Sequence, residues 1–251
     1  QYALSSALSV QNREEDALEV LSSTQKLLPE EPYPLQLRAN ILAAHGRVDE
    51  ALEALAMAEK LAPELPQIYF AEGELHLRQN NLASARQAYK KMARAAPGSG
   101  IALERLGLTH QLGGDFPEAE KLYLAALQLD PNLPVALNNL AYGALQDSGR
   151  HREALAWARR AVALAPENPQ FLDTLGMAQH ANAQLEAAIT TLEKALELAD
   201  VYPPANYHLG LIFEEQGRID KAKQHYELAA SGIGEAAALS RARMQALTET
   251  N

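Results

Sequence analysis

The sequence predicts an all-α protein built from repeated helix–turn–helix units that stack into a solenoid. Apolar residues recur at helical spacing, as at Leu137, Leu140, Ala141, Ala144 and Leu145. The sequence also repeats itself with a period of 34 residues. Finally, aromatic residues make up only 6% of the chain, which suits many thin helix–helix layers better than one thick core.

Four series of residues carry the period, with a single slip of one residue. The first series is Pro29, Pro63, Pro97, Pro131 and Pro166, and the second is Ser5, Ala39, Gly73, Gly107, Ala141, Gly176 and Gly210. The third is Ala17, Ala51, Ala85, Ala119, Ala154, Ala188 and Ala222, and the fourth is Thr24, Ala58, Met92, Ala126, Ala161, Ala195 and Ala229. Small residues at fixed places indicate that paired helices approach closely, and we expect Gly107 to face Ala119 and Ala126.

These residues resemble the tetratricopeptide repeat, a 34-residue unit of two helices, here called helix A and helix B. The resemblance covers about residues 1–234 and implies a right-handed superhelix. The sequence departs from the family pattern at three places. One extra residue lies in 146–149, Asp200 stands where a proline would close the sixth unit, and Met92 replaces a small residue.

Seven units are expected in tandem, the first lacking its first few residues. They cover about 1–31, 32–65, 66–99, 100–133, 134–168, 169–202 and 203–234. No Pro/Gly/Ser-rich linker separates them, so we expect one continuous solenoid. Residues 235–247 are expected to form a C-terminal capping helix. Since the chain begins inside a helix A pattern, we expect further sequence upstream of residue 1.

The turns between helix A and helix B carry residues that tolerate a left-handed backbone. Gly46, Asn80, Gly114, Gly149 and Gly217 occupy equivalent places. Ala183 breaks this pattern, and we expect Asn182 to take the left-handed conformation in its place.

Composition disfavours several classes of partner. The 22 basic residues are scattered among 32 acidic ones and the net charge is −10, so nucleic acid and anionic membranes are poor partners. The sequence contains no cysteine and no run of about 18 apolar residues, which predicts neither disulfides nor a membrane-spanning helix. A soluble chain of the cytoplasm or the periplasm is expected, and the compartment stays open.

No motif predicts catalysis, a cofactor or a metal. None of the seven histidines belongs to an H-E-x-x-H sequence. Residues 98–100 lack the context of a nucleophile elbow, and residues 112–115 fit a plain helix–helix turn. We therefore expect a protein that is not an enzyme, with no catalytic, cofactor-binding or metal-binding residue.

The resemblance implies that helices A line a concave groove in which peptides bind. The groove positions lie one residue after, three before and six before each small residue of the second series. These candidates are Tyr33, Gln36, Asn40, Gln67, Phe70, Glu74, Ile101, Glu104, Leu108, Val135, Asn138, Tyr142, Gln170, Asp173, Met177, Tyr207 and Leu211. They mix aromatic, aliphatic, amide and acidic side chains, as protein-binding patches do. In an alternative interpretation, Tyr142, Met177 and Leu211 only seal adjacent helices.

We expect a scaffold that binds a peptide or helical segment of another protein. Phe70, Tyr142 and Tyr207 would anchor apolar groups, and Asn138 and Gln170 would donate hydrogen bonds. Three acidic candidates, Glu74, Glu104 and Asp173, favour a neutral to basic segment. The candidate set contains no Lys or Arg, so an acidic tail is not expected as the ligand.

Two further possibilities stay open. The chain also fits the repeat portion of a larger bacterial protein, either a polysaccharide-export or secretion assembly or an enzyme with a separate catalytic domain. Self-association through the N-terminal end is possible as well, since Tyr2, Leu4 and Leu8 would form an apolar end there.

Overall fold

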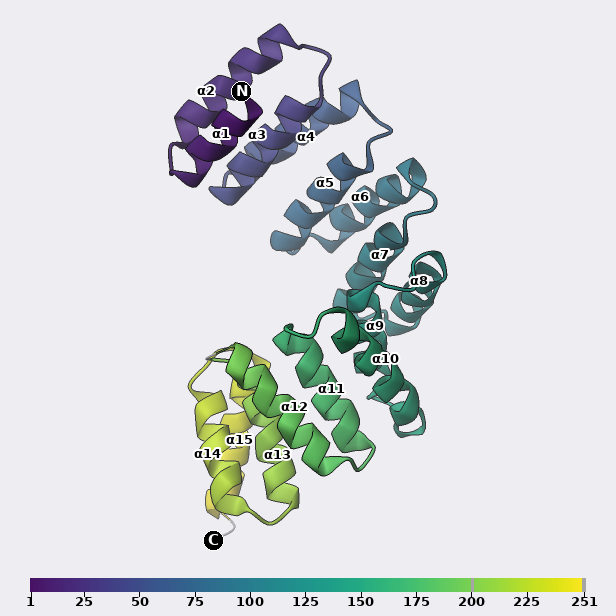
Figure 1. The fold of residues 1–251 in the computed structure, drawn as a ribbon, viewed down its shortest axis with the longest axis vertical. Coiled ribbons are helices and arrows are strands. Elements are labelled where there is room, and N and C mark those ends of the chain that lie inside the picture. Colours follow the sequence, from purple (N-terminus) through teal and green to yellow (C-terminus); the bar gives the residue numbers. More distant parts are fainter. Residues whose placement is uncertain (200, 250–251) are drawn as a thin grey trace. The chain divides into compact units, whose positions relative to one another are not determined.

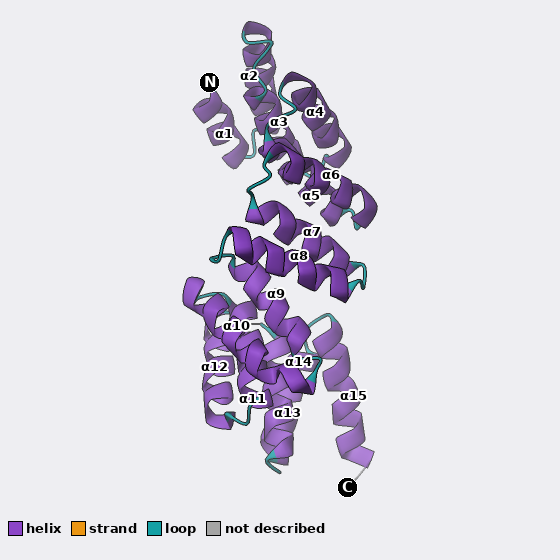
Figure 2. Cartoon of the chain, turned by 90° about the vertical axis from the view of Figure 1, so that its right-hand side faces the viewer, coloured by secondary structure: helices purple, strands orange, loops and turns teal. Residues whose placement is uncertain are grey.

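The structure is a computed structural model that describes residues 1–199 and 201–249. Within these residues it contains α-helices, one 3₁₀-helix and no strand (Figures 1 and 2). The departure from the repeat pattern at Asp200 lies outside the described residues. No helix in the described part is both long and apolar enough to pass through a bilayer.

The helices fall into two compact bodies, which we call the N-terminal half, Gln1–Asp130, and the C-terminal half, Pro131–Asn251. The N-terminal half contains α1 (Tyr2–Val10), α2 (Glu14–Leu27), α3 (Tyr33–Ala44), α4 (Val48–Leu61), α5 (Pro66–Arg78), α6 (Leu82–Ala95), α7 (Gly100–Leu112) and α8 (Phe116–Leu129). The C-terminal half contains α9 (Pro134–Ala144), η1 (Ser148–Arg150), α10 (His151–Leu164), α11 (Pro169–Ala181), α12 (Leu185–Leu198), α13 (Pro203–Glu215), α14 (Ile219–Ala230) and α15 (Glu235–Glu249).

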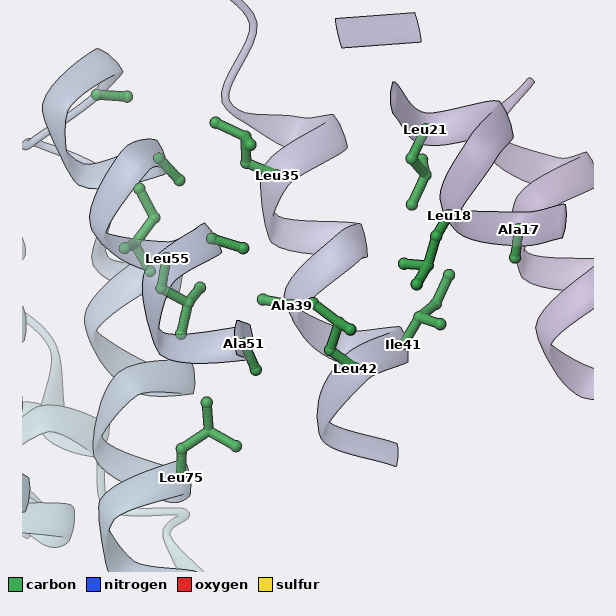
Figure 3. Close-up of a cluster of buried hydrophobic side chains, with 14 of the residues drawn as sticks. Ala17, Leu18, Leu21, Leu35, Ala39, Ile41, Leu42, Ala51, Leu55 and Leu75 are labelled. Carbon is green, nitrogen blue, oxygen red and sulfur yellow. The ribbon is translucent and has the colours of Figure 1, made fainter. Parts of the chain in front are cut away.

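Each half is a series of antiparallel helix pairs, as the predicted helix–turn–helix units require. In every pair, such as α3 with α4 and α13 with α14, a helix A packs on the helix B that follows it. The alanines of the third sequence series are almost fully buried at these contacts. Figure 3 shows the resulting core around α3, where Leu18 and Leu21 of α2 point toward Leu42 and its neighbours.

The glycines of helix A make room for a large residue of helix B. A Cβ atom on Gly73 would lie 2.4 Å from the ring of Tyr89, and one on Gly210 would lie 2.4 Å from the ring of Tyr226. Gly107 likewise accommodates Tyr123, whose ring would lie 2.7 Å from a Cβ atom there. The small residue is therefore required because a bulky side chain crosses over it.

Six of the turns between helix A and helix B share one backbone geometry. The residue after the C-cap has a positive φ at Asn12, Gly46, Asn80, Gly114, Ala183 and Gly217. The next N–H donates to the carbonyl five residues earlier, as from Arg47 to Leu42 at 2.9 Å and from Gln184 to Gln179 at 2.9 Å. The expectation that Asn182 replaces Ala183 is wrong, because Ala183 itself has a φ of 59°.

The remaining turn holds the extra residue of the fifth unit. It forms η1, and the side chain of Asp147 accepts a hydrogen bond from the N–H of Gly149 at 2.9 Å. Gly149 is not among the residues with positive φ, so the expectation of a left-handed glycine there is wrong.

The final helix, α15, covers the predicted capping segment and extends to Glu249. It packs on α14 and α13 of the C-terminal half. Arg243 lies 3.4 Å from the carboxylate of Glu214, and Arg241 donates to the carbonyl of Ala230 at 2.7 Å.

Candidate functional site

A hollow lies between the neighbouring helices A of the N-terminal half, and we call it the α3–α5 hollow. Its volume is about 540 Å³. It is lined by Gln36, Ala39, Asn40, Ala43 and Ala44 of α3, Leu55 of α4, and Gln67, Phe70, Ala71, Glu74, Leu75 and Arg78 of α5. Five of the predicted groove residues therefore gather around one space.

Helical periodicity explains why these side chains share a face. Along α5 the lining positions Gln67, Phe70, Glu74 and Arg78 follow one another at intervals of three or four residues. Small side chains, including Ala39 and Ala71, line the same surface and leave it open. The result is an apolar hollow bordered by amide and charged groups.

Glu74 is already engaged by two neighbours inside the protein. The hydroxyl of Tyr89 donates to its Oε1 at 2.6 Å, and Nη1 of Arg105 lies 3.5 Å from the same oxygen. Burial, together with this carboxylate, raises the pKa of the Tyr89 phenol far above its ordinary value. Tyr89 therefore stays protonated and holds Glu74 in place.

Basic side chains also reach this surface, contrary to the sequence-based expectation. Arg78 lines the hollow, and the guanidinium of Arg105 lies 5.3 Å from the centroid of the Phe70 ring. The sequence analysis did not include Arg78 because it considered only three positions in each helix A, and Arg78 lies one helical turn after the last of them. Extending the series by four residues beyond Glu74 reaches Arg78.

The other N-terminal candidates do not line the hollow. Tyr33 is exposed, and its ring packs edge-on against Tyr2 with centroids 4.7 Å apart. On α7, Ile101 is exposed and Leu108 is half-buried. Glu104 is buried.

Burial removes three candidates from the accessible surface. Glu104, Asn138 and Asp173 are 4%, 2% and 6% exposed, which contradicts the expectation that they face an open groove. Asp173 instead pairs with His208 at 2.7 Å, across α11 and α13. Two of the three acidic candidates, Glu104 and Asp173, are therefore buried, and of the three only Glu74 lines the hollow.

The remaining C-terminal candidates divide between exposed and packed positions. Tyr142 and Gln170 are exposed, and Met177 is half-buried. Tyr207 and Leu211 pack against the core of the C-terminal half, where the Tyr207 ring lies 6.1 Å from that of Tyr226. Leu211 therefore fits the alternative interpretation, in which such residues only seal adjacent helices. Tyr207, which was not part of that interpretation, is packed in the same way.

Among residues 1–199 and 201–249, no three His, Asp or Glu side chains are grouped so that they could hold a metal ion.

Comparison with known families gives a consistent result along most of the chain. One family model, described as a tetratricopeptide repeat, matches residues 37–100, 70–134 and 104–169. A second model with the same description matches residues 169–202 and 203–231. A curated relative, the TPR repeat-containing thioredoxin TTL4 of Arabidopsis thaliana, is 32% identical over 77 residues, which are 31% of this chain and 11% of that protein.

Solved structures of low sequence identity share the fold. A chain of the APC/C hetero-tetramer Cut9–Hcn1 matches with a TM-score of 0.77 and 16% identity, over 96% of this chain and 48% of that one. PilW, a type IV pilus biogenesis factor, matches with a TM-score of 0.69 and 16% identity, over 86% and 98%. YrrB, described as a TPR protein with an unusual peptide-binding site, matches with a TM-score of 0.55 and 19% identity, over 75% and 96%.

Proposed function

The chain belongs to the tetratricopeptide repeat family, and we propose that it is a non-catalytic scaffold whose helix A surface binds a segment of a partner protein. The α3–α5 hollow is the observation that carries this proposal. Its volume of about 540 Å³ falls within the range of about 300–1,000 Å³ that is usual for binding pockets. YrrB, which shares the fold, is itself described as having a peptide-binding site.

The lining suggests which chemistry the bound segment carries. Phe70 offers an aromatic surface, although Arg105 covers part of it. The amides of Gln36, Asn40 and Gln67 offer both donors and acceptors, as the peptide bonds of an extended segment require. Since Glu74 is balanced by Arg105, we infer a segment with an apolar anchor and no strong net charge.

Selection of peptides from a displayed random library tests this proposal. The affinity of an enriched peptide is measured by isothermal titration calorimetry with the unchanged protein and with Phe70→Ala and Asn40→Ala variants. Loss of the anchor should weaken binding at least about tenfold, which corresponds to about 1.4 kcal/mol.

Phe116→Ala is the matched control, because Phe116 is an exposed aromatic residue of the same half outside the hollow. It should leave the affinity unchanged. Peptides whose affinity is the same in the Phe70, Asn40 and Phe116 variants would place the binding surface elsewhere.

A second candidate is that this chain is the repeat portion of a larger protein, for which a bacterial origin rests on the sequence-based expectation alone. It spans 48% of the matching Cut9–Hcn1 chain and 11% of TTL4, whose description includes a thioredoxin. In that case the partner segment is held for an export or secretion assembly, or for a catalytic domain. The complete open reading frame decides, since a gene that ends at these boundaries would exclude it.

Association of two copies through α1 is a further part of the proposal. Leu4 of α1 is 53% exposed, whereas its counterparts Leu140 and Leu209 are buried beneath neighbouring helices. A second copy could cover this leucine in the same way. Sedimentation velocity of the unchanged chain and of Leu4→Glu tests it, and a monomer at all concentrations in both proteins would contradict it.

A further inference from the structure

A second hollow lies on the N-terminal half, and we call it the α2–α4 hollow. Its volume is about 400 Å³. It is lined by Leu21, Ser22, Gln25 and Lys26 of α2, Pro34, Leu35 and Arg38 of α3, and Glu50, Glu53, Ala54 and Met57 of α4. None of these residues lines the α3–α5 hollow, so the two surfaces are independent. Figure 3 shows Leu21 and Leu35 on the helices that border this space.

The same place one repeat later is filled by the protein itself. Thirty-four residues after Leu35 stands Tyr69, which is only 4% exposed. Its hydroxyl donates to the carbonyl of Pro63 at 2.7 Å. The ammonium of Lys91, the counterpart of Met57, lies 5.4 Å from the centroid of the ring and 3.0 Å from Glu59. A phenol ring with a cation above it therefore fits between helices at this position of the repeat.

The first copy of the site lacks both groups. Leu35 is shorter than a tyrosine, and Met57 is 53% exposed, so it does not cover the space. Gln25 takes the place of Glu59, and its Nε2 donates to the carbonyl of Pro29, the counterpart of Pro63, at 3.0 Å. The Oε1 of Gln25 is buried and has no hydrogen-bond partner. The carbonyl of Pro29 can accept a second hydrogen bond, because a carbonyl oxygen has two lone pairs, so a hydroxyl donor of the kind that Tyr69 carries has an acceptor here.

The border of the hollow favours an uncharged ring. It carries two basic residues, Lys26 and Arg38, and two acidic ones, Glu50 and Glu53. Glu50 already pairs with Arg47 at 2.6 Å. The border therefore has no excess of acidic charge, while the leucine, alanine and methionine side chains supply the apolar contact that an aromatic group requires.

We propose that the α2–α4 hollow binds a tyrosine side chain presented by a partner protein. The ring lies on Leu21, Leu35 and Met57, as the ring of Tyr69 lies between the corresponding helices. The phenol hydroxyl donates to the carbonyl of Pro29, as that of Tyr69 donates to the carbonyl of Pro63. The chain thus has a second docking surface, which recognises one aromatic residue.

The probe for this proposal is N-acetyl-L-tyrosinamide, titrated into protein whose methionine methyl groups carry carbon-13. The chain contains four methionines, Met57, Met92, Met177 and Met244, so the spectrum is simple. Binding should shift the Met57 signal saturably in the millimolar range and leave the buried Met92 and the Met177 of the C-terminal half unchanged. N-acetyl-L-leucinamide, which has no ring, should shift Met57 at least several-fold more weakly.

Two variants decide the outcome. Leu35→Tyr places a ring in the hollow as at Tyr69 and should abolish the Met57 shift, while circular dichroism and the other methyl signals report that the fold is kept. Met57→Lys supplies the cation that Lys91 provides one repeat later and should tighten binding roughly two- to fivefold, followed through the backbone amides of Leu35 and Ala54. Met57 is exposed, so Met57→Lys should leave the fold intact. This variant therefore still tests the proposal if Leu35→Tyr does not fold.

Three results would overturn the proposal. They are the absence of a Met57 shift at the solubility limit of the probe, an equal response to the leucine probe, and binding that persists in a folded Leu35→Tyr protein. Weaker or unchanged binding by Met57→Lys would overturn it as well, because the proposal rests on the correspondence with Tyr69 and Lys91.

Discussion

Ala183 holds a backbone conformation that suits glycine better. Its φ is 59°, at the turn position that Gly217 occupies in the next repeat with a φ of 71°. A Cβ in the left-handed region costs roughly 1–2 kcal/mol, part of which glycine loses again through the entropy of the unfolded chain. We predict that Ala183→Gly raises the free energy of unfolding by about 1 kcal/mol in urea titrations. Gly217→Ala, the reverse change at the equivalent turn, should lower it, and equal stability in both variants would contradict the argument.

Gly210 is small because the ring of Tyr226 passes over it. A methyl group there would lie 2.4 Å from the ring, so either the ring or the helix pair has to move. We predict that Gly210→Ala destabilises the C-terminal half by roughly 1–3 kcal/mol. Gly143 of α9 is the control, since a Cβ there meets nothing within 4 Å. Gly143→Ala should stabilise the helix by about 0.5–1 kcal/mol, measured by the same thermal or urea unfolding. A loss of stability in both variants would indicate another cause.

His225 makes the C-terminal half sensitive to acid. Burial, and to a smaller degree Lys221, lowers its pKa below the ordinary value of 6.5. Its ring stacks on Phe213 at 5.3 Å, and Nδ1 lies 2.9 Å from the side-chain oxygen of Asn206. Because the unfolded chain binds this proton more readily, the stability that the neutral ring contributes is present above pH 6.5 and is lost as the pH falls below it.

We therefore predict that the free energy of unfolding decreases between pH 7 and pH 5, and that His225→Gln reduces this decrease. Urea titrations at the two pH values measure both quantities. Lys221→Gln removes the smaller cause and should reduce the decrease less than His225→Gln. An unchanged pH dependence in the His225 variant would show that other groups determine it.

At the scale of helices, Arg105 connects α7 to α5. It lies over Phe70 and near Glu74, while Tyr89 of α6 donates to the same carboxylate. We predict that Arg105→Ala destabilises the N-terminal half by about 1 kcal/mol, a small value because both charged groups are partly solvated. A double-mutant cycle with Phe70→Ala should show a coupling of about 0.5–1 kcal/mol. Additive effects would mean that the stacked arrangement contributes nothing.

The sequence predicted the class and spacing of the helices well because each repeat folds through local contacts of fixed period. It did not predict which residue of the sixth turn is left-handed. Ala183 is the residue that the register of the other turns selects, since it lies 34 residues before Gly217. The prediction gave the preference of asparagine for this conformation more weight than the register, and it was wrong for that reason. The side chain of Asn182 instead donates from Nδ2 to the carbonyl of His151 at 2.7 Å.

The candidate site was predicted in part. Helical periodicity selected Gln36, Asn40, Gln67, Phe70 and Glu74, and these five residues line one hollow. It failed for other candidates of the same register because a neighbouring repeat covers them, as His208 does for Asp173. The identity of the covering side chain varies from repeat to repeat, so periodicity alone does not separate buried from accessible positions.

At the scale of the whole chain, the division between Asp130 and Pro131 was not anticipated from the sequence. No change of composition marks it, because it falls where one repeat meets the next. In a solenoid each repeat contacts only its neighbours, so most of the contacts that stabilise a repeat lie within its own half. We predict that fragments 1–130 and 131–251 each fold alone.

Circular dichroism of the separate fragments tests this prediction. Each should show a helical spectrum and a cooperative thermal transition. A fragment that is unfolded in isolation would show that the contacts within its half are not sufficient. Fragments cut inside a helix pair, between α7 and α8, serve as the control, because that cut separates two helices that pack on each other.

The turn that holds η1 differs from its six counterparts because it contains one more residue, yet α9 and α10 still pair as the other helices do. The chain has therefore already accepted an insertion at residues 146–149, where Ser148 and Gly149 are exposed. A fluorophore attachment peptide or a surface tether introduced there should leave the stacking of repeats undisturbed.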